Sequence, residues 1–482
     1  MSQSLLPSGR VSGRQLAELL GGWREHGARH ASADLAAGIQ LLARDGGLPI
    51  GTRLPAEREI ANHLAVSRTV ISAALDLLRA DGAVASRRGS GTWITLRGST
   101  HPADTASPPE FVDLARASPE AVPELAAAAR TAGARLAEHL GGHGYHERGL
   151  PLLRDKIAQR YAERGLPTTP DQIVITNGGH HAFVLVQRML TGPGDRILVD
   201  QPTYPNALDA IRASNTMPIG VRLRPDGWDH EEIEAALRQS APKLAYLVVD
   251  FHNPTGLRLD DEGRDRLAAA LRRTRTPAVI DETLVELDLG GDPAGSPAPM
   301  AGFAEDLVIT VGSASKSHWG GLRLGWIRAT PELADRIVAS RSSMDLGAPV
   351  FEQLVLAELL TGAEPILVQR RAELARRRDI ALAALTEKCP QWSFRRPGGG
   401  LSIWCELDQP VSTRLAIAGQ THGLRIVPGS RFGVHGGLER WLRVPFGLPP
   451  NELRAAITRL ARLAASMRTP GGEVDGGQPP IA

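Results

Sequence analysis

The sequence predicts an α/β protein in two parts, an N-terminal winged helix-turn-helix and a larger unit with a mostly parallel sheet. Two helix signals and a short basic hairpin follow one another within residues 33–96. A stretch rich in Pro, Ser and Thr at 97–110 lacks apolar periodicity and indicates a linker. Beyond it, short apolar runs alternate with amphipathic helices, the pattern of a sheet covered on both faces. At 482 residues, the chain is long enough for at least two domains.

The composition narrows the class of protein. Charged residues make up 22% of the chain and the formal net charge is +2, so a surface for nucleic acid or membrane must be local. The sequence lacks the residue order of a signal peptide and any apolar run of about 18 residues. Its two cysteines, Cys389 and Cys405, lack metal-ligand spacing. We expect a cytoplasmic protein without a metal site or disulfides, with both cysteines in its core.

The N-terminal module is expected to begin with a helical extension at 1–32 and a helix at 33–44. Pro55 is placed to open the first helix of a helix-turn-helix pair, and Ser67 to cap the second, which runs to about Asp81. Two short strand-like pieces joined by a basic turn follow. They predict a β-hairpin wing.

Arginines gather in this module. From Arg53 to Arg97 there are seven arginines against four acidic residues, mainly at the helix starts and the tip of the wing. Those positions meet phosphates and base edges when a recognition helix enters the major groove. A small helical domain with a solvated, Arg-rich face would show the same charges, so the charges alone leave both interpretations open.

The module contains the sequence motifs Arg-Leu-Pro-Ala-Glu-Arg-Glu, Val-Ser-Arg-Thr-Val and Arg-Arg-Gly-Ser-Gly-Thr. Through these motifs it closely resembles the winged helix of GntR-family transcription regulators, over roughly residues 33–96. The resemblance implies that the module binds a double-stranded DNA operator. The residues that it implies to contact DNA are Arg58, Ser67, Arg68, Thr69, Arg88 and Gly89.

Short apolar runs predict the strands of the larger unit. They lie at 173–176, 196–199, 244–249, 278–280 and 307–311. Ligands of such sheets bind outside the carboxyl ends of the strands, so the residues that follow each run are candidates for a site.

Each strand end offers a chemical group with an ordinary alternative. Gly179 opens a helix whose free N–H groups suit an anion, although a plain glycine turn would look the same. Tyr204 can stack on a ring or pack in a loop. Asn253 can donate to a phenolate-type oxygen or shape an Asn-Pro turn. Asp281 can pair with a protonated ring nitrogen or cap a helix.

The fifth strand end carries one of only four lysines, against 51 arginines among the 55 basic residues. An amine can form a Schiff base and arginine cannot, so a retained Lys316 indicates that chemistry. Small hydroxyl residues surround Lys316, and Arg323 follows seven residues later, as in a phosphate cradle. A surface lysine on a Ser/Gly loop is the alternative.

One cofactor, pyridoxal 5'-phosphate, would explain all five strand ends. Residues 111–468 resemble fold-type I aminotransferases in the order of their sequence motifs. These are Asn-Pro-Thr-Gly and then Ser-Ala-Ser-Lys, which is followed by Gly-Leu-Arg-Leu-Gly. The resemblance implies a large domain with a mostly parallel sheet and a small C-terminal α/β domain.

The resemblance also implies roles for single residues. Lys316 would be the catalytic Schiff-base lysine, Asp281 the partner of the pyridine nitrogen and Asn253 that of the phenolate, with Tyr204 stacked on the ring. Tyr145 would reach the phosphate across a dimer interface. The remaining phosphate-binding residues would be Gly179, His180, Ser313 and Arg323.

Arg443, in Trp-Leu-Arg-Val-Pro-Phe, resembles the small-domain arginine that binds a substrate carboxylate. Its guanidinium offers the two-pronged fork that this role needs. A structural salt bridge is the alternative for this residue.

A GntR-type winged helix joined to an aminotransferase-like domain is the architecture of MocR-type regulators, which the chain resembles over nearly its full length. Membership implies a homodimer in which the winged helix of one subunit packs against the large domain of the other. Two departures stand out: Thr283 where relatives commonly carry tyrosine, and His146-Glu147 near Tyr145. Residues 469–482 are expected to be a disordered tail.

Three functions follow from this resemblance. The first is a transcription regulator that senses pyridoxal phosphate, or an amino compound, through Lys316. The second is a working aminotransferase with an accessory DNA-binding module, which Thr283 disfavours because its side chain is shorter than tyrosine. The third is a regulator with a degenerate pocket, which the intact set of candidate residues disfavours.

Overall fold

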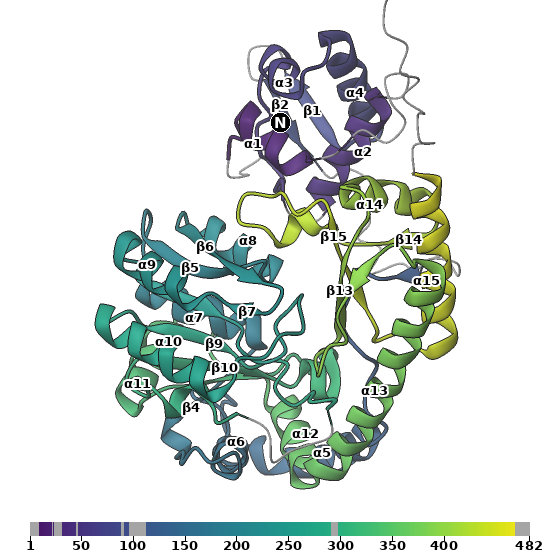
Figure 1. The fold of residues 1–482 in the computed structure, drawn as a ribbon. Helices are drawn as coiled ribbons and strands as arrows, with labels where there is room; N and C mark the ends of the chain where they lie inside the picture. The colour runs from purple at the N-terminus through teal and green to yellow at the C-terminus, as the bar shows by residue number, and fades with distance from the viewer. Residues whose placement is uncertain are drawn as a thin grey trace, which may run out of the picture.

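The computed structural model describes residues 9–21, 23, 31–44, 47–87, 91–95, 112–290 and 297–467. The predicted linker at 97–110 and tail at 469–482 lie outside this part of the chain, as do Arg88 and Gly89. Figure 1 shows the N-terminal module at one end of the molecule, seated on the C-terminal part, with the large sheet domain beside both. Within the described residues no helix is long and apolar enough to cross a membrane.

The N-terminal module has the predicted winged helix-turn-helix order. Its elements are α1 (Gly13–Leu20), α2 (Ala31–Arg44), α3 (Glu57–Leu64), α4 (Arg68–Ala80), β1 (Val84–Arg87) and β2 (Gly91–Ile94). Ala65 makes the turn between α3 and α4 in the left-handed conformation, and Ser67 caps α4 as predicted. Pro55 does not open α3, because the helix begins at Glu57 after Ala56. The two wing strands pair in antiparallel fashion.

The large domain contains an eight-stranded sheet in the order β4-β11-β10-β9-β8-β5-β6-β7. The strands β10, β9, β8, β5 and β6 are parallel, whereas β11 runs antiparallel to both neighbours and β7 forms a hairpin with β6. Five match predicted runs: β4 (Ile173–Thr176), β5 (Arg196–Gln201), β8 (Leu244–Leu247), β9 (Ala278–Asp281) and β10 (Val308–Ser313). Three were not predicted: β6 (Met217–Arg224), β7 (Gly227–Trp228) and β11 (Gly325–Arg328).

Helices cover both faces of the sheet, because alternate strand residues point to opposite sides. In β8, Leu244 and Tyr246 join one hydrophobic cluster, and Ala245 and Leu247 join the other. The first cluster includes α7 (Gly179–Leu190), α8 (Pro205–Ala213) and α11 (Pro331–Arg341). The second includes α5 (Leu125–Leu136), α6 (Pro151–Glu163), α9 (His230–Ser240), α10 (Asp261–Thr274) and α12 (Val350–Thr361). This double cover leaves the strand ends for a ligand.

The small domain is built on an antiparallel sheet of β12 (Ser393–Phe394), β13 (Ser402–Glu406) and β15 (Trp441–Pro445). Its helices are α13 (Ala363–Lys388), α14 (Ser412–Thr421) and α15 (Pro450–Ser466). A separate parallel pair joins β3 (Val112–Asp113) to β14 (Leu424–Arg425). Cys389 and Cys405 are buried in this core, as predicted.

Short helical turns connect these elements. They are η2 (Ala137–His139), η3 (Pro170–Gln172), η5 (Met300–Gly302), the π-helical turn η6 (Ser315–Trp319), η7 (Gly320–Leu322) and η8 (Gly429–Phe432). Two of them carry residues that concern the site. Lys316 lies in η6, and Arg431 of η8 forms an ion pair with Asp209 of α8.

The winged module packs on the small domain of the same chain. Helix α2 contacts α14, and a side-chain carbon placed on Gly38 would meet Leu20 and Ile417. Leu41 of α2 belongs to the hydrophobic cluster of the small domain. Arg431 lines both the small apolar cavity at this contact and the large cavity of the site. The winged module and the large cavity therefore share Arg431 of η8.

Candidate functional site

A cavity of about 600 Å³ lies where the carboxyl ends of the large-domain strands face the small domain. All but one of the residues predicted to bind cofactor or effector line it. They are Gly179, His180, Tyr204, Asn253, Asp281, Ser313, Lys316, Arg323 and Arg443. The exception is Tyr145, which is 54% exposed on the surface of this single chain. Its predicted reach across a dimer interface stays a prediction.

Lys316 lies in the π-helical turn η6 directly after β10, and its amine points into the cavity. Nζ donates a hydrogen bond to the backbone carbonyl of Ala117 at 2.8 Å. Burial lowers the pKa of the amine to about 8, and the guanidinium groups of Arg443 and Arg323 add to this against the opposing charge of Asp281. An amine with this pKa reaches its neutral, nucleophilic form close to neutral pH.

Asp281 ends β9 with its carboxylate held on both oxygens. The hydroxyl of Tyr246 donates to Oδ2 at 2.7 Å, and the backbone N–H of Thr283 donates to Oδ1 at 2.9 Å. No ion pair to Asp281 is found among the described residues. An oriented carboxylate without a cation suits a protonated ring nitrogen. Tyr246 was missed because it lies inside a buried strand, where a tyrosine is ordinarily part of the core.

The N-terminus of α7 and the loop after η7 form an anion cradle. Gly178 has φ 101°, and a side-chain carbon there would lie 2.9 Å from Nη2 of Arg323. A side-chain carbon on Gly179 would lie 3.0 Å from Oγ1 of Thr283 and 3.3 Å from Cβ of Ser313. Glycine therefore keeps the first turn of α7 open to the cavity. Free N–H groups at a helix start, with an arginine beside them, fit a phosphate.

Tyr204 and His180 form an aromatic wall of the cavity. Their rings meet edge to face with centroids 6.3 Å apart, and Asn206 donates to the hydroxyl of Tyr204 at 2.9 Å. Burial raises the pKa of Tyr204 and lowers the pKa of His180, so both side chains are uncharged near neutral pH. Neutral rings present a face for stacking without adding charge to the cavity.

Arg443 and Asn253 meet on the small-domain side. Nη1 of Arg443 donates to Oδ1 of Asn253 at 3.3 Å, and Nη2 donates to the backbone carbonyl of Ala115. Its guanidinium lies 5.2 Å from the ring centroid of Phe432, and burial lowers its pKa to about 10. Nε is buried and has no hydrogen-bond partner in the described part of the chain. No carboxylate among those residues pairs with Arg443, so the salt-bridge alternative finds no partner there.

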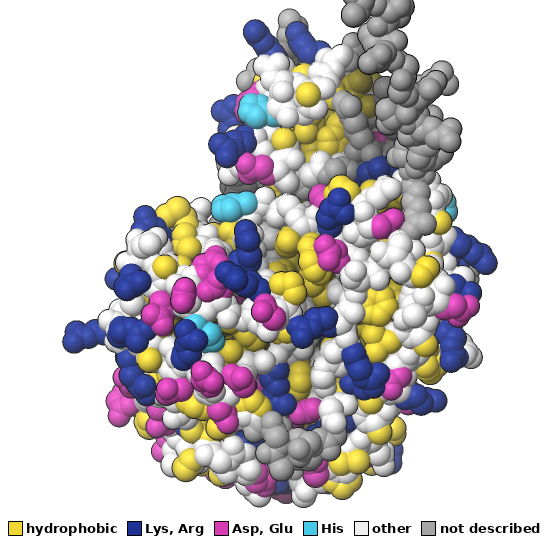
Figure 2. All heavy atoms as spheres, viewed as in Figure 1, with side chains coloured by type: hydrophobic (Ala, Val, Ile, Leu, Met, Phe, Trp, Pro, Cys, Tyr) yellow, Lys and Arg dark blue, Asp and Glu magenta, His cyan; other side chains and the backbone are white. Residues whose placement is uncertain are grey.

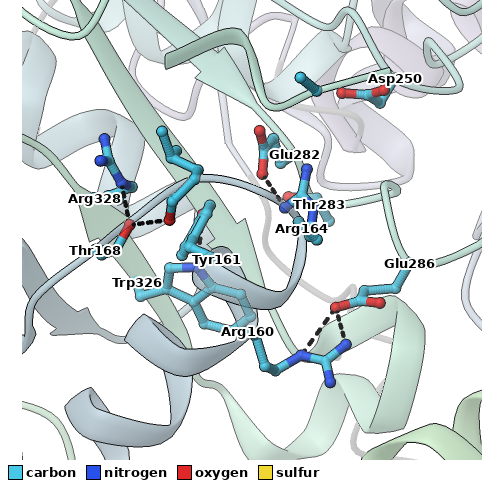
Figure 3. A network of polar contacts seen from close by, with 12 residues as sticks. Arg160, Tyr161, Arg164, Thr168, Asp250, Glu282, Thr283, Glu286, Trp326 and Arg328 are labelled. Carbon is cyan, nitrogen blue, oxygen red and sulfur yellow. Dashed lines mark hydrogen bonds and ion pairs between the residues drawn. The ribbon is translucent and has the colours of Figure 1, made fainter. Parts of the chain in front are cut away.

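The segment after β9 is fixed from beneath by two ion pairs (Figure 3). Arg164 donates to Glu282 at 2.7 Å, and Arg160 donates to Glu286 at 3.1 Å through Nε. These pairs hold the chain that positions Asp281 and Thr283. Thr283 and its neighbour Leu284 both line the cavity, and neither carries a phenolic hydroxyl.

The candidate DNA-binding residues lie on the winged module. Arg58, Arg68 and Thr69 are exposed at the starts of α3 and α4, and Ser67 is exposed with its hydroxyl accepting from the N–H of Val70 at 3.4 Å. Figure 2 shows Lys and Arg side chains gathered on the outer end of this module. The sequence therefore places three cationic or hydrogen-bonding groups around one helix start, where a phosphate or base edge can be met.

Comparison with known families agrees with this arrangement. The family described as Aminotransferase class I and II matches residues 115–460, and the family described as Bacterial regulatory proteins, gntR family, matches residues 31–94. The first match covers most of the chain.

Similar proteins fall into two groups. The probable rhizopine catabolism regulatory protein MocR of Rhizobium meliloti is 26% identical over 469 residues, which is 90% of this chain and 93% of that protein. Aromatic-amino-acid aminotransferase 1 of Thermococcus litoralis is 29% identical over 303 residues, 60% of this chain and 71% of that enzyme. The crystal structure of LysN, an alpha-aminoadipate aminotransferase from Thermus thermophilus complexed with N-(5'-phosphopyridoxyl)-L-leucine, superposes with a TM-score of 0.68 at 27% identity. That match covers 74% of this chain and 93% of LysN.

Proposed function

The chain belongs to the class I and II aminotransferase family and carries a GntR-family module at its N-terminus, and we propose that it is a MocR-type, pyridoxal phosphate-dependent transcription regulator. The aminotransferase-like domain senses pyridoxal phosphate or an amino compound, and the winged helix binds the operator. One observation carries the proposal. Nine predicted residues converge on one cavity, in a chain that also holds an intact winged helix-turn-helix.

The cavity fits pyridoxal phosphate on the chemistry of its own residues. Glycine keeps the start of α7 open beside Arg323, which suits the phosphate. The carboxylate of Asp281 is oriented by two hydrogen bonds and can accept a further hydrogen bond from a protonated ring nitrogen. The amine of Lys316, with a pKa of about 8, is the nucleophile. When bound, the cofactor supplies an aldehyde that captures amines and a ring that withdraws electrons.

The remaining residues orient and recognise. Asn253 lies beside Arg443 and presents an amide towards the cavity, while Tyr204 and His180 provide the stacking wall. Arg443 supports a carboxylate on the ligand through its guanidinium fork. These residues together select a small amino compound with a carboxylate.

An active aminotransferase with an accessory DNA-binding module is the second candidate. The complete set of Lys316, Asp281 and Arg443 around one cavity favours it. The absence of a phenol at Thr283 and Leu284 favours sensing over turnover, because no hydroxyl of that kind supports the amine chemistry there. Incubation with amino acids and a keto acid separates the two: repeated turnover at typical enzyme rates, about 1 per second or faster, would identify an enzyme.

The cofactor assignment has a spectroscopic test. Purified protein given pyridoxal phosphate is expected to become yellow, and Lys316→Ala is expected to abolish the absorbance of the lysine-bound cofactor. Lys243→Ala, at an exposed lysine away from the cavity, is the matched control and should keep the spectrum. A colourless wild-type protein that cannot be reconstituted would overturn the proposal.

The DNA assignment is tested on the winged helix. Arg68→Ala is expected to weaken binding to the promoter region of its own or a neighbouring operon, because Arg68 is exposed at the start of α4. Binding is measured by fluorescence anisotropy at physiological salt, since phosphate contacts depend on salt. Arg14→Ala, at an exposed arginine of α1, is the control. Equal affinity of Arg68→Ala and wild type would contradict the assignment of α4 as the recognition helix.

A further inference from the structure

Residues 114–122, which we call the strap, follow β3 and run along the cavity without regular secondary structure. Ala115, Arg116, Ala117 and Ser118 line the cavity. The strap is tied to its neighbours at both ends: Leu114 donates to the carbonyl of Arg425, and Val122 donates to that of His318. Between these ends, none of the described backbone-to-backbone hydrogen bonds is donated by residues 115–121.

The N–H groups of Ala115 and Arg116 donate to Oδ1 of Asp113. The strap is also held through its carbonyl oxygens, by three cations from three different elements. Arg443 of β15 donates to Ala115, Lys316 of η6 donates to Ala117 at 2.8 Å, and Arg370 of α13 donates to Glu120 at 2.7 Å. Two of these cations, Arg443 and Lys316, are the groups assigned to the ligand and the cofactor. The ligand site and the strap therefore draw on the same hydrogen-bond donors.

The geometry of Arg443 makes the competition specific. A guanidinium binds a carboxylate through two parallel N–H groups, either Nε with Nη2 or Nη1 with Nη2. Both forks contain Nη2, which donates to the carbonyl of Ala115. Nε, the second donor of the first fork, is buried and without a partner in the described residues. Nη2 carries two N–H groups, so a carboxylate bound by this fork and the carbonyl of Ala115 hydrogen-bond to the same nitrogen, where the charged oxygen is the stronger acceptor.

Lys316 adds to the same effect. As a protonated amine it has three N–H donors, one of which reaches Ala117. Engagement of Nζ by the cofactor leaves fewer donors for Ala117. Arg370 is the exception among the three cations, because it does not line the cavity and also donates to the carbonyls of Ser317 and His318. It keeps the end of the strap near Glu120 in place while the part near Ala115 is released.

The strap continues directly into the part of the chain that leads to the winged helix. Ahead of it, β3 pairs with β14 of the small domain, and the preceding described residue is Thr95, just past the wing. We propose that the strap is a displaceable latch: the carboxylate of a bound amino compound replaces the Ala115 carbonyl on Arg443, and the freed strap alters how the winged helix is held. This inference rests on the proposed function and adds its regulation. An amine without a carboxylate binds but leaves the latch closed.

The test locks the latch with a disulfide. A side-chain carbon placed on Gly320 would lie 3.4 Å from Oγ of Ser118, and Gly320 has a helical φ of −63° that any residue can adopt. The double variant Ser118→Cys, Gly320→Cys therefore places two sulfurs within bonding reach. The native cysteines, Cys389 and Cys405, are buried and do not compete. The full-length, cofactor-loaded variant is studied in two states, with the disulfide formed (oxidised) and with the disulfide broken (reduced).

DNA affinity is measured by anisotropy with and without each of the common amino acids. Coupled sites typically change affinity by about 5- to 150-fold, and we expect this response to disappear in the oxidised variant and return on reduction. An oxidised variant that responds like the reduced one overturns the latch alone. A wild-type protein whose DNA affinity changes with neither pyridoxal phosphate nor any amino acid overturns the sensing function, and the latch with it. A response to pyridoxal phosphate but to no amino acid overturns the latch alone.

A second measurement identifies the carboxylate as the trigger. Hydrogen exchange is followed at the amides of Ala115 and Arg116, which donate to Oδ1 of Asp113. It is compared between an amino acid that changes DNA affinity and the amine that lacks only its carboxylate. We expect faster exchange with the amino acid alone, although both change the absorbance of the cofactor. Equal exchange with the two ligands would overturn the role of Arg443 as the release point.

Discussion

At the scale of single residues, the charges of the cavity set the chemistry of Lys316. Burial lowers the pKa of its amine to about 8, and Arg443 and Arg323 act in the same direction. Asp281 opposes them but is itself held by Tyr246 and by the N–H of Thr283. The amine is therefore available near neutral pH, whereas an exposed lysine, with a pKa of about 10.4, is protonated there.

This lowered pKa predicts how cofactor capture depends on pH. Capture needs the neutral amine, so its rate is expected to rise with pH and to level off above about 8, where Lys316 has lost its proton. Stopped-flow absorbance between about pH 6 and pH 10 measures the profile.

Arg443→Gln supplies the matched comparison for this profile. Removing a cation that lowers the pKa of Lys316 is expected to move the midpoint upward. A wild-type rate that keeps climbing to about pH 10 would show that the cavity does not perturb the amine.

At the scale of elements, the starts of α4 and α7 differ, because a side chain caps the first helix and none caps the second. The first turn of α7 stays open because Gly178 and Gly179 have no side chains. The first turn of α4 is capped by Ser67, which the resemblance to GntR-family winged helices predicts to contact DNA as well. A capping hydroxyl that also faces solvent can serve both roles.

The two roles of Ser67 make different predictions. As a cap, Ser67→Ala is expected to cost about 0.5–2 kcal/mol of stability, because the N–H of Val70 loses its side-chain acceptor. Thr69→Ala, two residues further along the chain and without a capping bond, is the control for stability. Thermal unfolding and DNA anisotropy are measured on both variants. Weaker DNA binding of Ser67→Ala with unchanged stability would assign the residue to contact and not to the cap.

At the scale of the whole molecule, the winged helix and the small domain share a surface. Helix α2 packs on α14, and Arg431 in η8 touches both this contact and the cavity. The pairing predicted by resemblance, with the large domain of a partner subunit, remains a prediction alongside this contact. Because α14 belongs to the small domain, a movement of that domain over the cavity would also move the surface on which α2 packs.

A charge placed between α2 and α14 tests that shared surface. Gly38 is buried against Leu20 and Ile417, so Gly38→Glu is expected to separate the module from the small domain. Ala33→Glu, on the exposed side of the same helix, is the matched control. We expect calorimetry to show two unfolding transitions for Gly38→Glu and the cofactor spectrum to persist. A single transition at the wild-type temperature would argue against this docking.

The fold was predictable where burial along a strand is continuous. The five predicted strands are buried along nearly all of their length, including β4 at one edge of the sheet, and their apolar runs reflect cover on both faces. β6 was missed because it alternates between buried and exposed residues and contains Pro218 and Gly220. β11 was missed because it is short and directly follows the lysine loop.

The candidate site was predictable where side chains carry the chemistry. The cavity residues were found through the motifs that hold them, and nine of the ten come together. The contributions of Ala115 and Ala117 were not predictable, because a backbone carbonyl leaves no signature in the residue type. Tyr246 was equally hidden, since its hydroxyl acts from within a buried strand.

The strap's reliance on carbonyl oxygens has an evolutionary consequence. Every residue type offers the same main-chain acceptor, so the side chains at Ala115 and Ala117 can drift without changing what Arg443 and Lys316 hold. Substitution at wall positions such as Val427 can then change which ligand the cavity accepts without changing these two contacts.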